Sequence, residues 1–289
     1  MPPHQFQRLL RTVVLAIAIG YGIANVVWSI SGWTLVDVNA YWQAAERIKH
    51  GQELYPVFAN PNAPEVFRYA PWFAAAWIPF TYLPRALVDI AWSTFLVGAS
   101  AVALWPLFRT RRSEAVVLTG LIGSFLLLVA SVGNVQPLIV ASLVWGLDRR
   151  SGPIWVAIAA SLKATPIVFV LVYVARREWK RAAAALLLTA LLTAPMLLYD
   201  LSGYTLEAGE TFGFMAVSPA AFLIVAATSV AWAAVAAWRR SPSVVIAAST
   251  ASVLCLPRVF PYLFTFLLVG GPRPAGSGSP HAPDTAGRQ

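Results

Sequence analysis

Apolar segments of helical length follow one another along most of the chain, separated by short polar or proline-containing stretches. They cover, approximately, residues 12–32, 70–83, 86–107, 115–132, 135–147, 153–162, 164–175, 182–199, 217–238, 243–256 and 259–270. Because a bilayer core leaves backbone polar groups without water, a chain that crosses it repeatedly favours helices. The pattern predicts an all-α, polytopic helical membrane protein with about ten spans, some of them short re-entrant or half-length helices.

The composition agrees with this class and excludes others. Of the 289 residues, 58% are hydrophobic and 11% are charged, whereas a soluble globular protein has roughly a quarter of its residues charged. A disordered chain is excluded by the same apolar excess. The histidines and the single cysteine form no cluster with metal-ligand spacing, so we expect no metal and no cofactor. A glycine-rich phosphate loop is also missing from the sequence, which argues against an ATP-driven motor.

Basic residues gather in alternate loops, which predicts the topology. Cytoplasmic loops of membrane proteins are enriched in Lys and Arg. We therefore place on the inside Arg8, Arg11, Arg109, Arg111, Arg112, Arg149, Arg150, Arg176, Arg177, Lys180, Arg181, Arg239, Arg240, Arg273 and Arg288. The inside then holds 15 basic and four acidic residues, and the outside holds six basic and eight acidic ones. The net charge of +9 thus reflects topology, and we expect no nucleic-acid partner.

This topology makes two segments unusual. Arg150 and Arg176 must lie on one side, so the apolar stretch between them must cross twice or re-enter as two short arms. Pro166 favours a chain break near residues 163–166, which holds Lys163 at the tip of a short hairpin near the outer face. The alternation of inside and outside loops leaves no membrane crossing for the segment 70–83. This segment should therefore re-enter from outside or lie along the membrane interface.

The outer loop 33–69 contains a further helix. Apolar residues recur at helical spacing at Val38, Tyr41, Trp42, Ala45 and Ile48, opposite Glu46, Arg47 and Lys49. Such a pattern is typical of an interfacial amphipathic helix with its aromatic residues at headgroup level. We expect residues 1–270 to form one integral-membrane domain with a retained first span, and residues 271–289 to form a disordered cytoplasmic tail.

Ionisable residues at the membrane edge are costly and are therefore functional candidates. Asp37 directly follows the first span, where partial burial could make it a general base for a hydroxyl group. The alternative is that Asp37 only caps the N-terminus of the helix over 38–50. Lys163 could bind a lipid phosphate, or it could be a lysine that snorkels to the headgroups.

Further candidates lie on the same, outer side. Arg258 could pair with a phosphate, or it could form an ion pair with an outer-loop acid. Asn134 and Gln136 offer amides suited to sugar hydroxyls, or they could form only a polar turn. The same sugar or acceptor site could include Tyr41, Tyr55, Arg68 and Tyr69, although the tyrosines could instead belong to an aromatic belt. One acid, separated cations and amides at one face would suit transfer from a phosphate-linked lipid, whereas a transporter would favour polar groups near the midplane.

Four blocks of residues in this order resemble the membrane glycosyltransferases of family 87, in the GT-C superfamily. The blocks are Asp37-Val-Asn-Ala-Tyr41 with Gly51 to Tyr55; Phe67-Arg68-Tyr69-Ala70-Pro71; Gly133-Asn134-Val-Gln136-Pro137 with Ser161-Leu162-Lys163; and Pro257-Arg258 with Tyr262. Such enzymes are similar to bacterial polyprenyl-phosphate-mannose-dependent α-mannosyltransferases. The resemblance spans about residues 12–270.

The resemblance implies transfer of a hexose, with mannose the commonest, from a polyprenyl-phosphate donor to a glycolipid or glycan hydroxyl of the envelope. It implies that the active site faces outward from the bacterial cytoplasmic membrane and that no metal is required. Asp37 matches the family's candidate general base, and Lys163 and Arg258 would by analogy stabilise the leaving phosphate. The rival interpretations are a transporter or flippase for lipid-linked sugars and a catalytically degenerate partner subunit.

Overall fold

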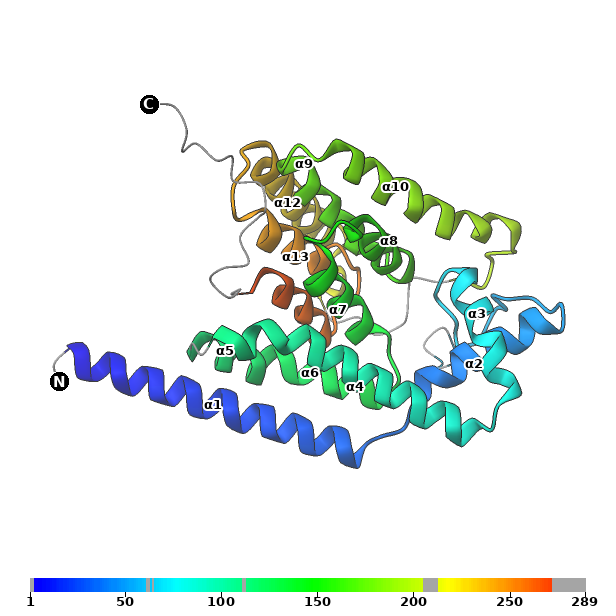
Figure 1. Ribbon diagram of the computed structural model, residues 1–289, viewed down its shortest axis with the longest axis horizontal. Helices are drawn as coiled ribbons and strands as arrows, with labels where there is room; N and C mark the ends of the chain where they lie inside the picture. The colour runs from blue at the N-terminus through cyan, green and yellow to red at the C-terminus, as the bar shows by residue number, and fades with distance from the viewer. Residues whose placement is uncertain (1–2, 61–62, 64, 111–112, 205–212, 272–289) are drawn as a thin grey trace, which may run out of the picture.

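The computed structural model describes residues 3–60, 63, 65–110, 113–204 and 213–271. Within these ranges the regular structure is helical and contains no strand. The prediction of an all-α, polytopic membrane protein is confirmed. Figure 1 shows the N-terminal end of the long first helix on one side of the molecule, with the short helices α2 and α3 at the opposite side.

Long apolar helices form one part of the structure. They are α1 (Pro3–Ser31), α4 (Arg85–Thr110), α5 (Ser113–Leu118) continued through η2 (Thr119–Gly123) into α6 (Ser124–Ser131), α10 (Trp179–Thr193) with η4 (Ala194–Leu198), and α12 (Pro219–Trp238). Five stretches of the described chain are long and apolar enough to cross a membrane, and they fall in these helices. Most of their side chains are exposed on the outside of the bundle, as expected of surfaces that face lipid.

Shorter helices make the centre of the bundle. They are α7 (Gln136–Gly146), α8 (Gly152–Leu162), η3 (Thr165–Phe169) with α9 (Val170–Ala175), α13 (Val244–Leu254) and η5 (Pro261–Gly270). Because α7, α8 and α13 have 11 residues each, they are only about 16 Å long. The predicted half-length helices are therefore present. The predicted hairpin is present as well, since α8 and η3 meet at a turn that contains Lys163.

Two turns bring the chain around Arg150 and Arg176 to the same end of the bundle, as the predicted topology requires. Nη1 of Arg176 lies 2.7 Å from Oδ1 of Asp148. Arg181 donates hydrogen bonds to the backbone carbonyls of Leu147 and Arg149. These contacts tie the α7–α8 turn to the start of α10, so the intervening chain runs to the opposite end and returns.

At that opposite end α2 (Val36–Lys49), α3 (Pro71–Trp77) and η1 (Ile78–Tyr82) pack together. The segment 70–83 therefore forms two short helices and no long span. Tyr41 of α2 has no exposed surface, so its ring packs inside the protein and does not face lipid headgroups. Its ring contacts those of Phe73, Trp77 and Trp92, because α3 and α4 cover this face of α2.

The break between α1 and α2 determines where Asp37 lies. The backbone N–H groups of Thr34 and Leu35 donate to the carbonyl of Ser131, and that of Asp37 donates to the carbonyl of Val132. Leu35 adopts a left-handed conformation with φ 50°, which is rare for a residue with a β-carbon. Asp37 thus lies in the first turn of α2, and no side chain caps this helix. The alternative that Asp37 is only an N-cap is wrong.

The predicted single domain over residues 1–270 stays a prediction. Of the predicted tail 271–289, all but Gly271 lies outside the described residues.

Candidate active site

The turn between α6 and α7 holds Asp37 through Asn134. Asn134 donates from Nδ2 to Oδ2 of Asp37 over 2.7 Å. Its Oδ1 accepts the backbone N–H of Gln136 over 2.9 Å. Since the amide oxygen faces its own turn, the amide nitrogen must face the carboxylate. Asn134 therefore gives Asp37 a hydrogen-bond donor at Oδ2, and within the described residues no hydrogen bond reaches Oδ1.

The same turn holds Lys163 through Gln136. Oε1 of Gln136 accepts a hydrogen bond from Nζ of Lys163 over 2.8 Å. Nε2 of Gln136 donates to Oγ1 of Thr265 over 3.1 Å. Gln136 and Thr265 have no exposed surface. One turn of the chain thus supplies a donor to the acid and an acceptor to the cation.

Each of the two predicted phosphate-binding cations lies against one ring of a stacked pair. The rings of Phe260 and Tyr262 lie 5.4 Å apart between centroids, at an interplanar angle of 11°. The guanidinium carbon of Arg258 lies 4.5 Å from the centroid of Phe260, and Nζ of Lys163 lies 4.7 Å from that of Tyr262. Both distances are within the range of cation–π contacts. Lys163 and Arg258 are thus linked through two rings that contact each other.

Arg68 lies near both Asp37 and Arg258. Burial lowers the pKa of Arg68, the positive charge of Arg258 lowers it further, and the negative charge of Asp37 opposes this. Two guanidinium groups from distant parts of the chain are thus close enough to repel each other. An anion between them would relieve that repulsion.

The charges of Asp37 and Lys163 act on each other. Burial raises the pKa of Asp37, while the hydrogen bond from Asn134 and the charges of Lys163 and Arg68 oppose the rise. Burial lowers the pKa of Lys163 to about 7, and the carboxylate of Asp37 opposes that change. An acid with a raised pKa and an amine with a lowered one, whose charges interact in a partly buried site, are typical of catalytic centres.

The predicted tyrosines lie behind the charged groups. The hydroxyl groups of Tyr41 and Tyr69 are 3.3 Å apart, and the hydroxyl of Tyr55 donates to the backbone carbonyl of Tyr69 over 2.8 Å. Tyr41 and Tyr55 are buried, so an aromatic-belt position is wrong for these two. They support Tyr69, which lies beside Asp37 and Arg68.

All nine predicted site residues therefore gather at one end of the bundle, and their roles stay predictions. Sequence reasoning missed Thr265 and Phe260. The signal for Thr265 was weak, because a single threonine in the apolar run 259–270 is usually a residue that bonds its own helix. Asn134 and Gln136 were expected to contact sugar. They contact Asp37 and Lys163 instead, and a sugar contact stays a prediction.

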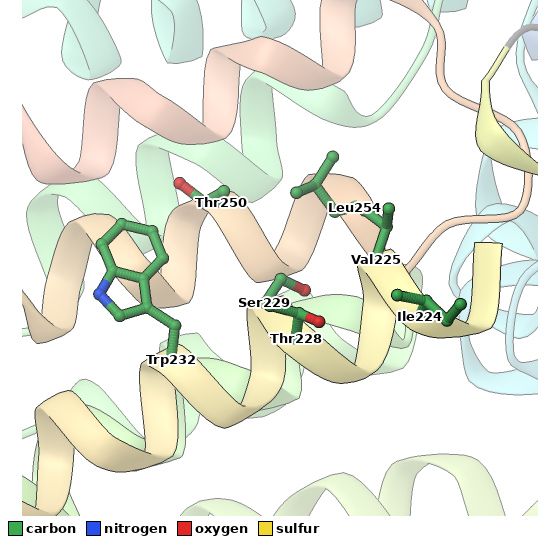
Figure 2. Close-up of a pocket in the computed structure, with 7 residues that line it drawn as sticks. All are labelled: Ile224, Val225, Thr228, Ser229, Trp232, Thr250 and Leu254. Atoms are coloured by element: carbon green, nitrogen blue, oxygen red, sulfur yellow. The ribbon is translucent and has the colours of Figure 1, made fainter. Parts of the chain in front are cut away.

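A separate open groove of about 350 Å³ lies between α12 and α13 (Figure 2). Its walls are Ile224, Val225, Thr228, Ser229, Trp232, Thr250 and Leu254. The hydroxyls of Ser229 and Thr250 donate to carbonyl groups of their own helices, so the groove presents mainly apolar surface. It includes none of the polar residues of the candidate site. In the described part of the chain, no three His, Cys, Asp or Glu side chains are grouped as metal ligands.

Comparison with known proteins gives one match. Residues 67–205 match the family model described as glycosyltransferase family 87, in agreement with the resemblance drawn from the sequence. The matched range contains Arg68, Asn134, Gln136 and Lys163, while Asp37 and Arg258 lie on either side of it. No curated protein and no solved structure gives a match.

Proposed function

Because residues 67–205 match the family model of glycosyltransferase family 87, we propose that this chain is a membrane glycosyltransferase that transfers a hexose from a polyprenyl-phosphate donor. The acceptor is a hydroxyl of an envelope glycolipid or glycan. Mannose is the sugar that the resemblance favours. The reaction takes place at the outer face of a bacterial cytoplasmic membrane, since the candidate site lies at the bundle end opposite the arginine-rich turns.

One observation carries the proposal: an acid and three cations from four separate segments meet at a single end of the bundle. The charges of Lys163 and Arg68 lower the pKa of Asp37, and the charge of Arg258 lowers the pKa of Arg68. Ion clusters of this kind are costly to assemble in a membrane protein unless they bind a ligand or act in chemistry.

In the proposed reaction Asp37 is the general base. Its Oδ1 accepts the proton of the acceptor hydroxyl while the hydroxyl oxygen forms a bond to the anomeric carbon of the sugar. The bond between that carbon and the phosphate oxygen breaks, and the polyprenyl phosphate leaves with the bonding electrons. Burial supports this role, because a raised pKa makes the Asp37 carboxylate a stronger base.

The leaving phosphate gains negative charge, which the cations stabilise. In the proposed reaction Arg258 and Arg68 bind the phosphate together, which the interaction between their charges supports, and Lys163, whose charge interacts with that of Asp37, adds to this stabilisation. The alternative for Arg258 is an ion pair with an outer-loop acid. Glu207 and Glu210 of that loop lie outside the described residues.

The test is a transfer assay in reconstituted vesicles. Radiolabelled polyprenyl-phosphate-mannose is supplied with a crude envelope glycolipid extract, and wild type is compared with Asp37→Asn. We expect the loss of the base to lower the rate by about 10²- to 10⁴-fold. Asp89→Asn is the matched control, because Asp89 lies at the start of α4 and its carboxylate pairs with Arg85 over 2.7 Å.

An active and correctly inserted Asp37→Asn protein would rule out the base. If wild type binds the donor tightly without transferring sugar, the transporter or the degenerate subunit becomes the better explanation. Absence of donor binding would argue against a lipid-linked donor.

A further inference from the structure

The hydrogen bonds behind Lys163 have a fixed direction. Oγ1 of Thr265 lies 2.6 Å from the backbone carbonyl of Tyr262, and a carbonyl can only accept, so the threonine hydroxyl must be the donor. The oxygen of Thr265 is then left to accept, and Nε2 of Gln136 donates to it. The amide of Gln136 is thereby oriented with its oxygen towards Lys163.

We propose that Thr265 is a positioning residue: by orienting the amide of Gln136, it keeps an acceptor in front of Lys163 and so favours the charged, fixed ammonium form in the site. The importance of this charge for transfer rests on the proposed function. The orientation of the amide and its effect on the amine do not.

Two features make the orientation matter. First, Gln136 and Thr265 have no exposed surface, so water has little access to replace a lost hydrogen bond. Second, an amide that turned around would present N–H groups to the ammonium group, and two donors repel. Among the described groups that face Lys163, the titratable ones are Asp37 from α2 and Tyr262 from η5. The carboxylate of Asp37 and the ring of Tyr262 both favour the cation, and the oriented amide adds to them.

The test measures the protonation of Lys163 directly. The chain has three lysines, Lys49, Lys163 and Lys180. Trace acetylation with acetic anhydride at a series of pH values, read by mass spectrometry, reports the unprotonated fraction of each amine. Thr265→Val keeps the shape of the side chain but removes the hydroxyl. Thr265→Ser keeps the hydroxyl and is the matched control.

In Thr265→Val we expect the labelling midpoint of Lys163 to move to lower pH by about one unit, because the ammonium form loses its oriented acceptor. Thr265→Ser should retain the wild-type midpoint. The midpoints of Lys49 and Lys180 should be the same in all three proteins. In the transfer assay, the fall in rate at high pH should move with the midpoint of Lys163.

Gln136→Glu provides a second variant with an opposite prediction. A carboxylate can accept through either oxygen, so it needs no orientation by a hydroxyl. We expect Gln136→Glu to raise the midpoint of Lys163, and the further change Thr265→Val to have little effect in that background. The proposal is overturned if Thr265→Val leaves the midpoint of Lys163 unchanged, or if Thr265→Ser lowers it as much as valine does. If the midpoints behave as expected but no variant, wild type included, transfers sugar, the orienting role stands and the proposed function fails.

Discussion

Replacing Asn134 by aspartate should move the acid limb of the pH–rate profile to higher pH. Asn134→Asp keeps the size of the side chain and the oxygen that accepts the N–H of Gln136. It changes only the group that faces Asp37, from an N–H donor to a second carboxylate oxygen. The perturbation is thus confined to the 2.7 Å contact between the two side chains.

The magnitude follows from that distance. At an effective dielectric constant of about 20, two unit charges 2.7 Å apart repel by ~6 kcal/mol. Two carboxylates in this position therefore share one proton near neutral pH, and their titration belongs to the pair. Because the carboxylate at position 134 keeps the hydrogen bond from the N–H of Gln136, we expect it to stay ionised and the shared proton to lie on Asp37, which then cannot act as a base. Relaxation of the site will absorb part of the repulsion, so we expect the acid limb to rise by at least about two pH units.

The sign follows from the protonation state that the reaction needs. Asp37 must be ionised to accept a proton, so the rate falls as the pH falls through the pKa of Asp37. Burial has already raised this pKa, and the hydrogen bond from Asn134 lowers it again. Asn134→Leu removes that hydrogen bond without adding a charge and should move the limb by only about one unit.

The assay is the initial rate of sugar transfer in vesicles across a pH series, with thermal unfolding of each variant as the control for folding. The midpoint of the acid limb should increase from wild type to Asn134→Leu to Asn134→Asp. The maximal rate should also fall, since ionised Asp37 and protonated Lys163 then coexist over a narrower pH range. Equal acid limbs in the three folded proteins would refute the assignment of Asp37 as the titrating base.

Three further predictions concern packing. Gly120→Leu should separate α1 from η2 and lower the melting temperature in detergent by several degrees, because a β-carbon at Gly120 would meet the backbone oxygen of Ala18; an unchanged melting temperature would contradict this close contact. Gly133→Ala should lower the free energy of unfolding by about 1–2 kcal/mol because of the positive φ alone, since φ is 84° there. Unfolding experiments measure this loss directly, and an unchanged free energy of unfolding would contradict the prediction. Arg181→Met should destabilise the arginine-rich end by about 0.5–1.5 kcal/mol for each lost hydrogen bond, because the carbonyls of Leu147 and Arg149 each lose a donor while Tyr173 still donates to Leu147; faster proteolysis of the α7–α8 turn would report it, whereas wild-type resistance would show that these bonds are dispensable.

Much of the architecture could be predicted from the sequence. The number and length of apolar segments indicate a helical membrane protein, because the rise per residue of an α-helix and the thickness of a bilayer together determine how many apolar residues a span needs. The positions of Arg150 and Arg176 require the chain between them to return, and this placed Lys163 at a turn. These inferences depend on order along the chain and on charge, which are properties of the sequence itself.

The depth of Tyr41 could not be predicted in this way. Its spacing on α2 showed correctly that it belongs to the apolar face. Whether that face meets lipid or protein depends on α3 and α4, which join it from elsewhere in the chain. An amphipathic pattern shows which face of a helix is buried, but it does not show whether lipid or another part of the protein covers that face.

The candidate site shows the same division. Asp37, Lys163 and Arg258 could be selected from the sequence, because charges at a membrane edge are costly and therefore informative. The roles of Asn134 and Gln136 were decided by tertiary structure, since which end of an amide faces which neighbour depends on hydrogen bonds made across the bundle. Thr265 could not be found in advance, because it lies more than a hundred residues from Gln136 and only the packing of η5 against α7 brings them together. The order and charge of residues along the chain are enough to predict the kind of fold and the charged groups that it must place. The packing of short helices determined which of those groups meet and in which orientation they are held, because hydrogen bonds depend on distance and direction in space.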